Sequence, residues 1–139
     1  TNKTIKEFSK FENIKTEAFY NTNTRFDFFL KKNDRKVFLE VKNVTLSIKK
    51  NVAEFPDAIT SRGTKHLTKL MEAKKEGYES YILYLIQRED CNQFKIADKI
   101  DIEYKKTFIE AKNKGVKILS YNCKLSPQEI KVNEPVKIL

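Results

Sequence analysis

Two short stretches in which apolar and polar residues alternate, 25–31 and 36–44, restrict the fold of this chain more than any other feature. In each stretch Phe, Val or Leu occupies every second position, which is the period of a strand with one buried face. Phe26, Phe28 and Leu30 should therefore share a face of the first strand. Because the residues between the stretches are polar, the segment predicts an antiparallel β-hairpin.

Three side chains of this hairpin are unusual in a half-buried strand: Asp27, Glu40 and Lys42. A symmetric loop of two or four residues places Asp27 directly opposite Glu40, and Arg25 opposite Lys42. Side chains that face each other in this way have Cβ atoms about 5 Å apart. Two carboxylates so close repel each other, so the register requires something that neutralises them. A loop of odd length would instead offset the two acids.

The residues leave three explanations open for this acidic pair. The carboxylates could bind a divalent cation, one of them could be protonated, or Arg25 and Lys42 could neutralise them as an ordinary surface cluster. Mg²⁺ takes oxygen ligands and often only one or two protein carboxylates, and the carbonyl of Val41 could add a third oxygen. Lys42 could then orient a water or stabilise charge on a phosphate.

The remainder of the chain alternates between helical and strand-like patterns. We expect helices over 2–11, 57–77 and 101–115, and strands over 13–20, 80–87 and 116–122. The order αβββαβαβ predicts an α/β fold with a mixed central sheet flanked by helices on both faces. Its first part should be an antiparallel meander, and its last strand–helix–strand unit a parallel pair joined by a right-handed crossover. Asp57 is the expected N-cap of the second helix, with Ile59 on its apolar side.

Charge and cysteine content limit the partners and the compartment. The chain has 28 Lys and Arg residues against 19 acids, a net charge of +9. This excess favours a polyanionic partner, nucleic acid before an anionic membrane, although solubility alone is an alternative explanation. The longest apolar run, 81–86, is too short to span a bilayer. Cys91 and Cys123 lack metal-type spacing, which predicts free thiols and a cytoplasmic location.

The second helix carries a basic stripe, with Arg62, Lys65 and Lys69 at helical spacing. Such a stripe can contact phosphates or can simply be a solvated face. Gly63 in the same helix suggests close packing or a close backbone approach. His66 is the only histidine, and a lone histidine is more often packed or surface-exposed than catalytic.

The pattern of Asp27 on one strand and Glu40-Val41-Lys42 on the next is similar to that of the PD-(D/E)XK nucleases. The expected element order also resembles that restriction-endonuclease-like architecture. A narrower resemblance is to the sugar fermentation stimulation protein A (SfsA) family. The motifs that carry it are "TRFDFFL" (24–30), "LEVKNVTL" (39–46), "FPDAITSRGTKHLTKL" (55–70), "IDIEYKKTF" (100–108) and "GVKILSY" (115–121).

The resemblance implies a two-domain protein of bacteria and archaea with an N-terminal OB-like domain and a C-terminal nuclease-like domain. Only the second domain matches this chain, so we expect residues 1–139 to form one domain of a longer protein. The resemblance further implies a DNA-binding protein or a DNA/RNA nuclease that uses Mg²⁺ or Mn²⁺. A link to the regulation of sugar (maltose) metabolism comes from the family name. The oligomeric state stays open, a homo-oligomer included.

The family pattern also assigns candidate residues. Asp27, Glu40 and Lys42 match catalytic positions, and the two acids match metal ligands. Glu7 matches a commonly acidic position on the first helix and is a further candidate ligand, unless it is an exposed helical residue. Relatives commonly have Gln where this chain has Thr64. The expected nucleic-acid contacts are Arg25, Arg62, Lys65, His66 and Lys69. The main hypothesis is a metal-dependent nuclease, and the alternative is a non-catalytic DNA-binding regulator on the same scaffold.

Overall fold

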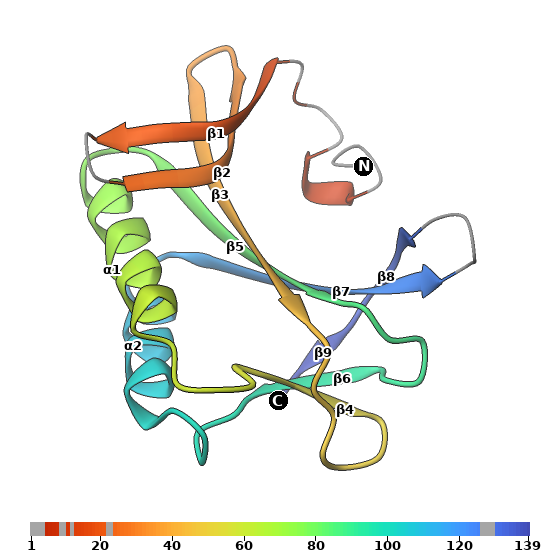
Figure 1. The fold of residues 1–139 in the computed structure, drawn as a ribbon. Helices are drawn as coiled ribbons and strands as arrows, with labels where there is room; N and C mark the ends of the chain where they lie inside the picture. The colour runs from red at the N-terminus through yellow and green to blue at the C-terminus, as the bar shows by residue number, and fades with distance from the viewer. Residues whose placement is uncertain (1–4, 9–10, 12, 22–23, 126–129) are drawn as a thin grey trace.

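The computed structural model describes residues 5–8, 11, 13–21, 24–125 and 130–139, and it centres on a mixed six-stranded sheet (Figure 1). The strand order is β1-β2-β3-β5-β7-β8. Its strands are β1 (Asn13–Asn21), β2 (Thr24–Lys32), β3 (Arg35–Val44), β5 (Glu79–Ile86), β7 (Lys117–Leu125) and β8 (Ile130–Pro135). β1 to β3 form an antiparallel meander, β3, β5 and β7 are parallel, and β8 is antiparallel to β7. The predicted mixed sheet is therefore confirmed.

Three short strands form a second, parallel sheet that the sequence did not reveal. They are β4 (Val52–Phe55), β6 (Gln93–Ile96) and β9 (Lys137–Ile138), in the order β4-β6-β9. Strands of two to four residues are too short to show a clear period. The expected order αβββαβαβ is accordingly incomplete, because it lacks these strands and β8.

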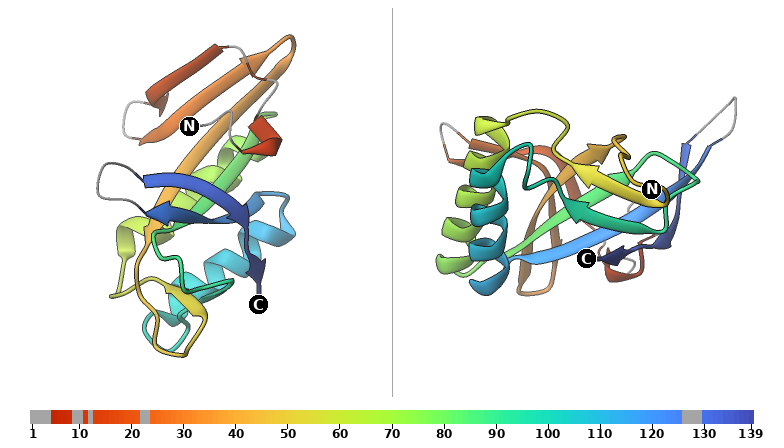
Figure 2. Two further views of the ribbon diagram at one scale, coloured as in Figure 1. Left: turned by 90° about the vertical axis from the view of Figure 1, so that its right-hand side faces the viewer. Right: turned by 90° about the horizontal axis from the view of Figure 1, so that it is seen from below.

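Both α-helices lie on the same face of the six-stranded sheet, which corrects the expectation of helices on both faces (Figures 1 and 2). They are α1 (Ser61–Lys75) and α2 (Ile102–Asn113). The reason is the handedness of the crossovers. The steps from β3 to β5 and from β5 to β7 run in one direction across the sheet, so right-handed connections put both helices on one side.

The opposite face is covered by the N-terminal segment instead of a full helix. Within the described residues, the predicted helix over 2–11 is reduced to a 3₁₀ turn at Lys6–Phe8, while 2–4 and 9–10 lie outside them. Ile5, Phe8 and Phe11 are buried there against Leu39 and other residues of the sheet. The centres of the Phe8 and Tyr81 rings are 5.1 Å apart.

α1 begins later than predicted. Its N-cap is Thr60, whose Oγ1 accepts a hydrogen bond from the backbone N–H of Gly63 (3.0 Å), so Asp57 is not the cap. Ile59 precedes the helix and is 80% exposed, against the expected apolar position. The start is fixed by a distant residue, because the backbone N–H of Thr60 donates to Asp101 Oδ2 (2.9 Å).

The hairpin register agrees with the prediction over its closed end. Phe28 pairs with Leu39, and the ladder continues to Lys32 and Arg35 at the turn. The ladder between β2 and β3 ends at Phe28 and Leu39, so the expected pairing of Arg25 with Lys42 does not form.

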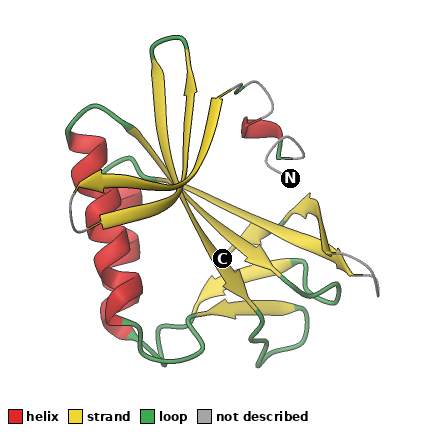
Figure 3. Cartoon of the chain, turned by 45° about the horizontal axis from the view of Figure 1, so that its top comes forward, coloured by secondary structure: helices red, strands yellow, loops and turns green. Residues whose placement is uncertain are grey.

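β1 and β2 bend sharply beyond this point (Figures 1 and 3). The pairing of β1 with β2 is interrupted at Glu17, which has a φ of 48°. Phe26 consequently joins the core on the helix side of the sheet, where the centres of its ring and that of Phe38 are 5.1 Å apart. Alternation had predicted that Phe26 would share the face of Phe28, so that prediction is wrong. Beyond Phe28 and Leu39 the pairing of β2 with β3 stops, which leaves a gap in the ladder between these strands.

Candidate active site at the open end of the hairpin

Two carboxylates replace the backbone ladder where β2 and β3 separate. Asp27 Oδ2 accepts a hydrogen bond from the backbone N–H of Val41 (2.8 Å). In return the backbone N–H of Asp27 donates to Glu40 Oε1 (3.2 Å). The structure thus brings Asp27 and Glu40 together, and each carboxylate is oriented by the opposite strand.

Glu40 is the centre of a charged cluster. It is only 3% exposed, and its Oε2 lies 3.2 Å from Lys42 Nζ and 2.6 Å from His66 Nδ1. Lys42 Nζ and His66 Nδ1 are themselves 2.9 Å apart. Lys42 shares a strand face with Glu40, whereas His66 reaches the cluster from α1. No sequence pattern indicates the contact between His66 and Glu40, because 26 positions separate them along the chain.

The surroundings push the pKa values of the two carboxyl groups in opposite directions. Burial acts to raise the pKa of Glu40, but the hydrogen bond from His66 and the charge of Lys42 outweigh it and hold that pKa below its usual value. Burial raises the pKa of Asp27, and the negative charge of Glu40 adds to the rise despite the hydrogen bond from Val41. Pairs of acids whose pKa values are shifted apart in this way are common in active sites, since one acid stays ionised while the other protonates more readily.

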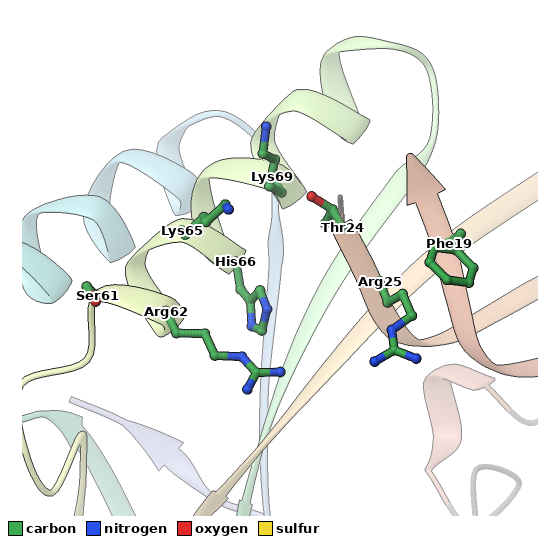
Figure 4. A pocket seen from close by; sticks show the side chains of 8 residues that line it. All are labelled: Phe19, Thr24, Arg25, Ser61, Arg62, Lys65, His66 and Lys69. Carbon is green, nitrogen blue, oxygen red and sulfur yellow. The ribbon is translucent and has the colours of Figure 1, made fainter. Parts of the chain in front are cut away.

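A basic groove of about 640 Å³ adjoins this cluster (Figure 4). One wall is the first half of α1, and the other is formed by the ends of β1 and β2. The lining residues are Phe19, Thr24, Arg25, Ser61, Arg62, Lys65, His66 and Lys69. All five residues expected to contact nucleic acid are therefore in one groove. His66 belongs both to the groove and to the charged cluster, so it connects the two.

The structure does not bring Glu7 to this site. Its Oε1 accepts a hydrogen bond from the hydroxyl of Tyr121 (2.7 Å), on the face of the sheet opposite α1. No group of three or more His, Cys, Asp or Glu side chains in the described ranges could hold a metal.

Other residues named from the sequence have structural roles. The hydroxyl of Thr64 bonds to the carbonyl of Thr60 within α1 (3.2 Å). Cys91 and Cys123 are buried, free thiols.

Neither α1 nor α2, the α-helices in the part of the chain that the structure describes, is long and apolar enough to cross a membrane.

The fold and the family comparison together define a restriction-endonuclease-like α/β domain. A family model described as the sugar fermentation stimulation protein RE domain matches residues 1–129. The chain is 49% identical over 138 residues to a sugar fermentation stimulation protein homolog of Pelagibacter ubique, covering 99% of this chain and 60% of that protein. A homolog from Bdellovibrio bacteriovorus is 42% identical over 131 residues, 93% of this chain and 54% of that protein. The chain belongs to the sugar fermentation stimulation protein (SfsA) family.

The chain spans about 60% or less of the length of these relatives. It is also similar to a solved structure, that of Pyrococcus furiosus SfsA in complex with Ca²⁺, with a TM-score of 0.89 and 22% identity. The match covers 99% of this chain and 59% of that one. The α/β fold with a mixed sheet and two helices is therefore that of an SfsA protein.

Proposed function

We propose that this domain hydrolyses phosphodiester bonds in nucleic acid with the help of a divalent cation, Mg²⁺ or Mn²⁺. The observation that carries the proposal is the meeting of Asp27, Glu40 and Lys42 in one cluster beside a groove lined by Arg and Lys side chains. A nuclease needs both parts, since the acids hold the cation and the groove holds the phosphates.

The residues present fit a hard divalent cation. One oxygen of each carboxylate accepts a hydrogen bond from a backbone N–H, which fixes its orientation. The other oxygen of Asp27 can serve as a ligand, whereas Glu40 Oε2, which contacts Lys42 and His66, would exchange part of these contacts for the cation. The carbonyl of Val41 should face the same gap as its N–H, because both groups of a strand residue point to one side. One or two carboxylates are a usual protein contribution to a Mg²⁺ site. The Ca²⁺ bound to the archaeal relative, another oxygen-preferring cation, supports a divalent cation here.

Lys42 is the proposed assistant of hydrolysis. When bound, a divalent cation supplies positive charge beside the scissile phosphate and makes water more acidic. The ammonium of Lys42, held 3.2 Å from Glu40 Oε2, can orient the attacking water and donate to a phosphate oxygen. His66 holds the same carboxylate from α1, with its Nδ1 2.6 Å from Glu40 Oε2.

The groove is the proposed binding surface for the nucleic-acid backbone. Arg25 lies on one wall, and Arg62, Lys65 and Lys69 lie on the other, so a strand between them would have cations on both sides. Phosphate contacts fix position without reading base sequence. Both DNA and RNA therefore fit these residues.

A DNA-binding regulator without catalysis is the alternative. Such a protein would need only the groove. Asp27 and Glu40 would place negative charge next to bound phosphates and weaken their binding, which gives a pure binder no advantage. The acidic pair therefore favours the enzyme.

The test combines metal titration with cleavage assays. Calorimetric titration with Mn²⁺ should show binding to the wild type and to Lys42→Met, and little binding to Asp27→Asn or Glu40→Gln. Cleavage of labelled single- and double-stranded DNA and RNA should fall by about a hundredfold or more in all three variants. Lys106→Met, on the exposed side of α2, is the matched control and should cleave normally. Metal-independent DNA binding without cleavage, unaffected by these changes, would leave the regulator as the correct function.

A further inference from the structure

One aromatic ring in the basic groove has no role in the cluster of Asp27, Glu40 and Lys42. Phe19, near the end of β1, is 67% exposed. Among the Phe and Tyr side chains of the described ranges it is the only exposed one, and the others are buried or half-buried. A solvated phenyl ring contributes little to the core, and in this groove its face is accessible to a ligand.

The guanidinium of Arg25 lies over this ring within the groove. Phe19 and Arg25 are paired residues on β1 and β2, and the guanidinium carbon of Arg25 lies 5.6 Å from the centre of the ring. The two side chains, which come from neighbouring strands, therefore make a cation–π contact. Figure 4 shows Phe19 and Arg25 on one side of the groove, across from Arg62, Lys65 and Lys69 on α1.

The lining of the groove restricts what can cover Phe19. It contains four Arg and Lys side chains and no Asp or Glu. An apolar protein surface would have to desolvate these cations without neutralising them, which is unfavourable. A ligand that is both anionic and aromatic satisfies the two features together, and a nucleotide has this combination.

We infer that the groove binds unpaired nucleotides, with a base stacked on Phe19 while the backbone follows the cations of α1. The inference rests on the proposed nucleic-acid function and names its substrate class, single-stranded nucleic acid or the frayed end of a duplex. Bases inside a duplex stack on each other and expose only their edges, so they offer no face to Phe19. Stacking on aromatic side chains beside a basic track is the usual way to bind single strands without sequence preference.

The test measures binding separately from cleavage. Fluorescence anisotropy with labelled oligonucleotides of about 12 nucleotides, in buffer containing EDTA, compares single-stranded DNA, single-stranded RNA and the corresponding DNA duplex. The wild type should bind the single strands more tightly than the duplex. Phe19→Ala should weaken single-strand binding roughly tenfold and leave duplex binding within about twofold, whereas Phe19→Tyr should restore it. A loss confined to DNA or to RNA identifies which single strand is bound.

Ile109→Ala is the matched control, because Ile109 is also an exposed apolar residue (46%) but lies on α2, outside the groove. Equal wild-type affinity for single strands and duplex, or an equal loss for both in Phe19→Ala, would overturn the stacking inference. Metal-dependent cleavage by the wild type would then still support the nuclease. Absence of both binding and cleavage would overturn the two proposals together.

Discussion

Glu40 shows how one buried residue combines stability with chemistry. A buried carboxylate is costly unless it is paired and hydrogen-bonded. Glu40 meets this requirement through the backbone N–H of Asp27, the ammonium of Lys42 and the ring of His66. The same contacts keep it ionised and fixed in direction, which are the properties that a metal ligand requires.

Gly63 is the residue whose small size the structure explains best. A Cβ at this position would lie 2.9 Å from the side chain of Thr60 and 3.2 Å from the ring of Tyr104. Alanine would otherwise favour the helix by about 1 kcal/mol. Because of this crowding we expect Gly63→Ala to destabilise the protein instead, and to lower the free energy of unfolding by about 1–2 kcal/mol, as measured by urea denaturation.

The same change in a Thr60→Gly background tests the cause. Glycine is tolerated at an N-cap at a cost of a few tenths of a kcal/mol. Without the Thr60 side chain, Gly63→Ala should lose at least half of its destabilising effect. An unchanged effect in that background would assign the crowding to Tyr104 alone.

Asp101 links the two helices at the level of secondary-structure elements. It caps α2 through a hydrogen bond from the backbone N–H of Tyr104 to Oδ1 (3.0 Å). Its other oxygen, Oδ2, accepts from the N–H of Thr60, the N-cap of α1 (2.9 Å). One carboxylate, only 6% exposed, therefore fixes where both helices begin. The position of His66 on α1, and so its contact with Glu40, depends on this start.

Asp101→Ala should consequently affect stability more than the loss of a single cap. It removes one cap, worth about 1 kcal/mol, and leaves the Thr60 N–H without its partner at a further cost of about 1–2 kcal/mol. We expect thermal or urea denaturation to show a total loss of about 2–3 kcal/mol. Asp98→Ala, an exposed acid shortly before the helix, should change stability by less than about 0.5 kcal/mol. Equal effects of the two variants would contradict the linking role of Asp101.

At the scale of the whole molecule, the net charge of +9 matters because of where part of it is concentrated. Arg25, Arg62, Lys65 and Lys69 come from two different walls of one groove. Some other cations are paired on the surface, as Lys106 is with Glu103 (3.8 Å) and Lys114 with Glu110 (3.0 Å). In the groove, Lys69 pairs with Glu72 of the same helix (3.1 Å). The field that attracts a polyanion should therefore depend on the groove cations more than on the total charge.

The salt dependence of nucleic-acid binding measures this directly. Each phosphate contact on a single strand contributes about −0.7 to the slope of log affinity against log salt concentration. Lys65→Ala should make the slope less steep by about 0.7, and Lys106→Ala should leave it unchanged. Anisotropy titrations at several salt concentrations give both slopes. Equal slopes for the wild type and Lys65→Ala would exclude a phosphate contact at Lys65.

The amino-acid sequence determined the features that depend on local periodicity. Alternation in β2 and β3, with a polar turn between them, predicted the hairpin, its closed-end register and the approach of Asp27 to Glu40. Helical spacing likewise predicted the basic stripe on α1. These predictions hold where the element is regular, because a period of two, or of 3.6, then fixes which side chains share a face. Alternation failed at Phe26, where β2 bends and the side chain joins the opposite core from Phe28.

Tertiary structure decided everything that depends on contacts between distant segments. The shared face of the two helices, the parallel sheet of β4, β6 and β9, and the bend at Glu17 have no local signature. The contact of His66 with Glu40, like the position of Phe19 across the groove from α1, joins elements far apart in the chain. Such contacts are set by the direction of the crossovers and by packing, which no periodicity within one element records.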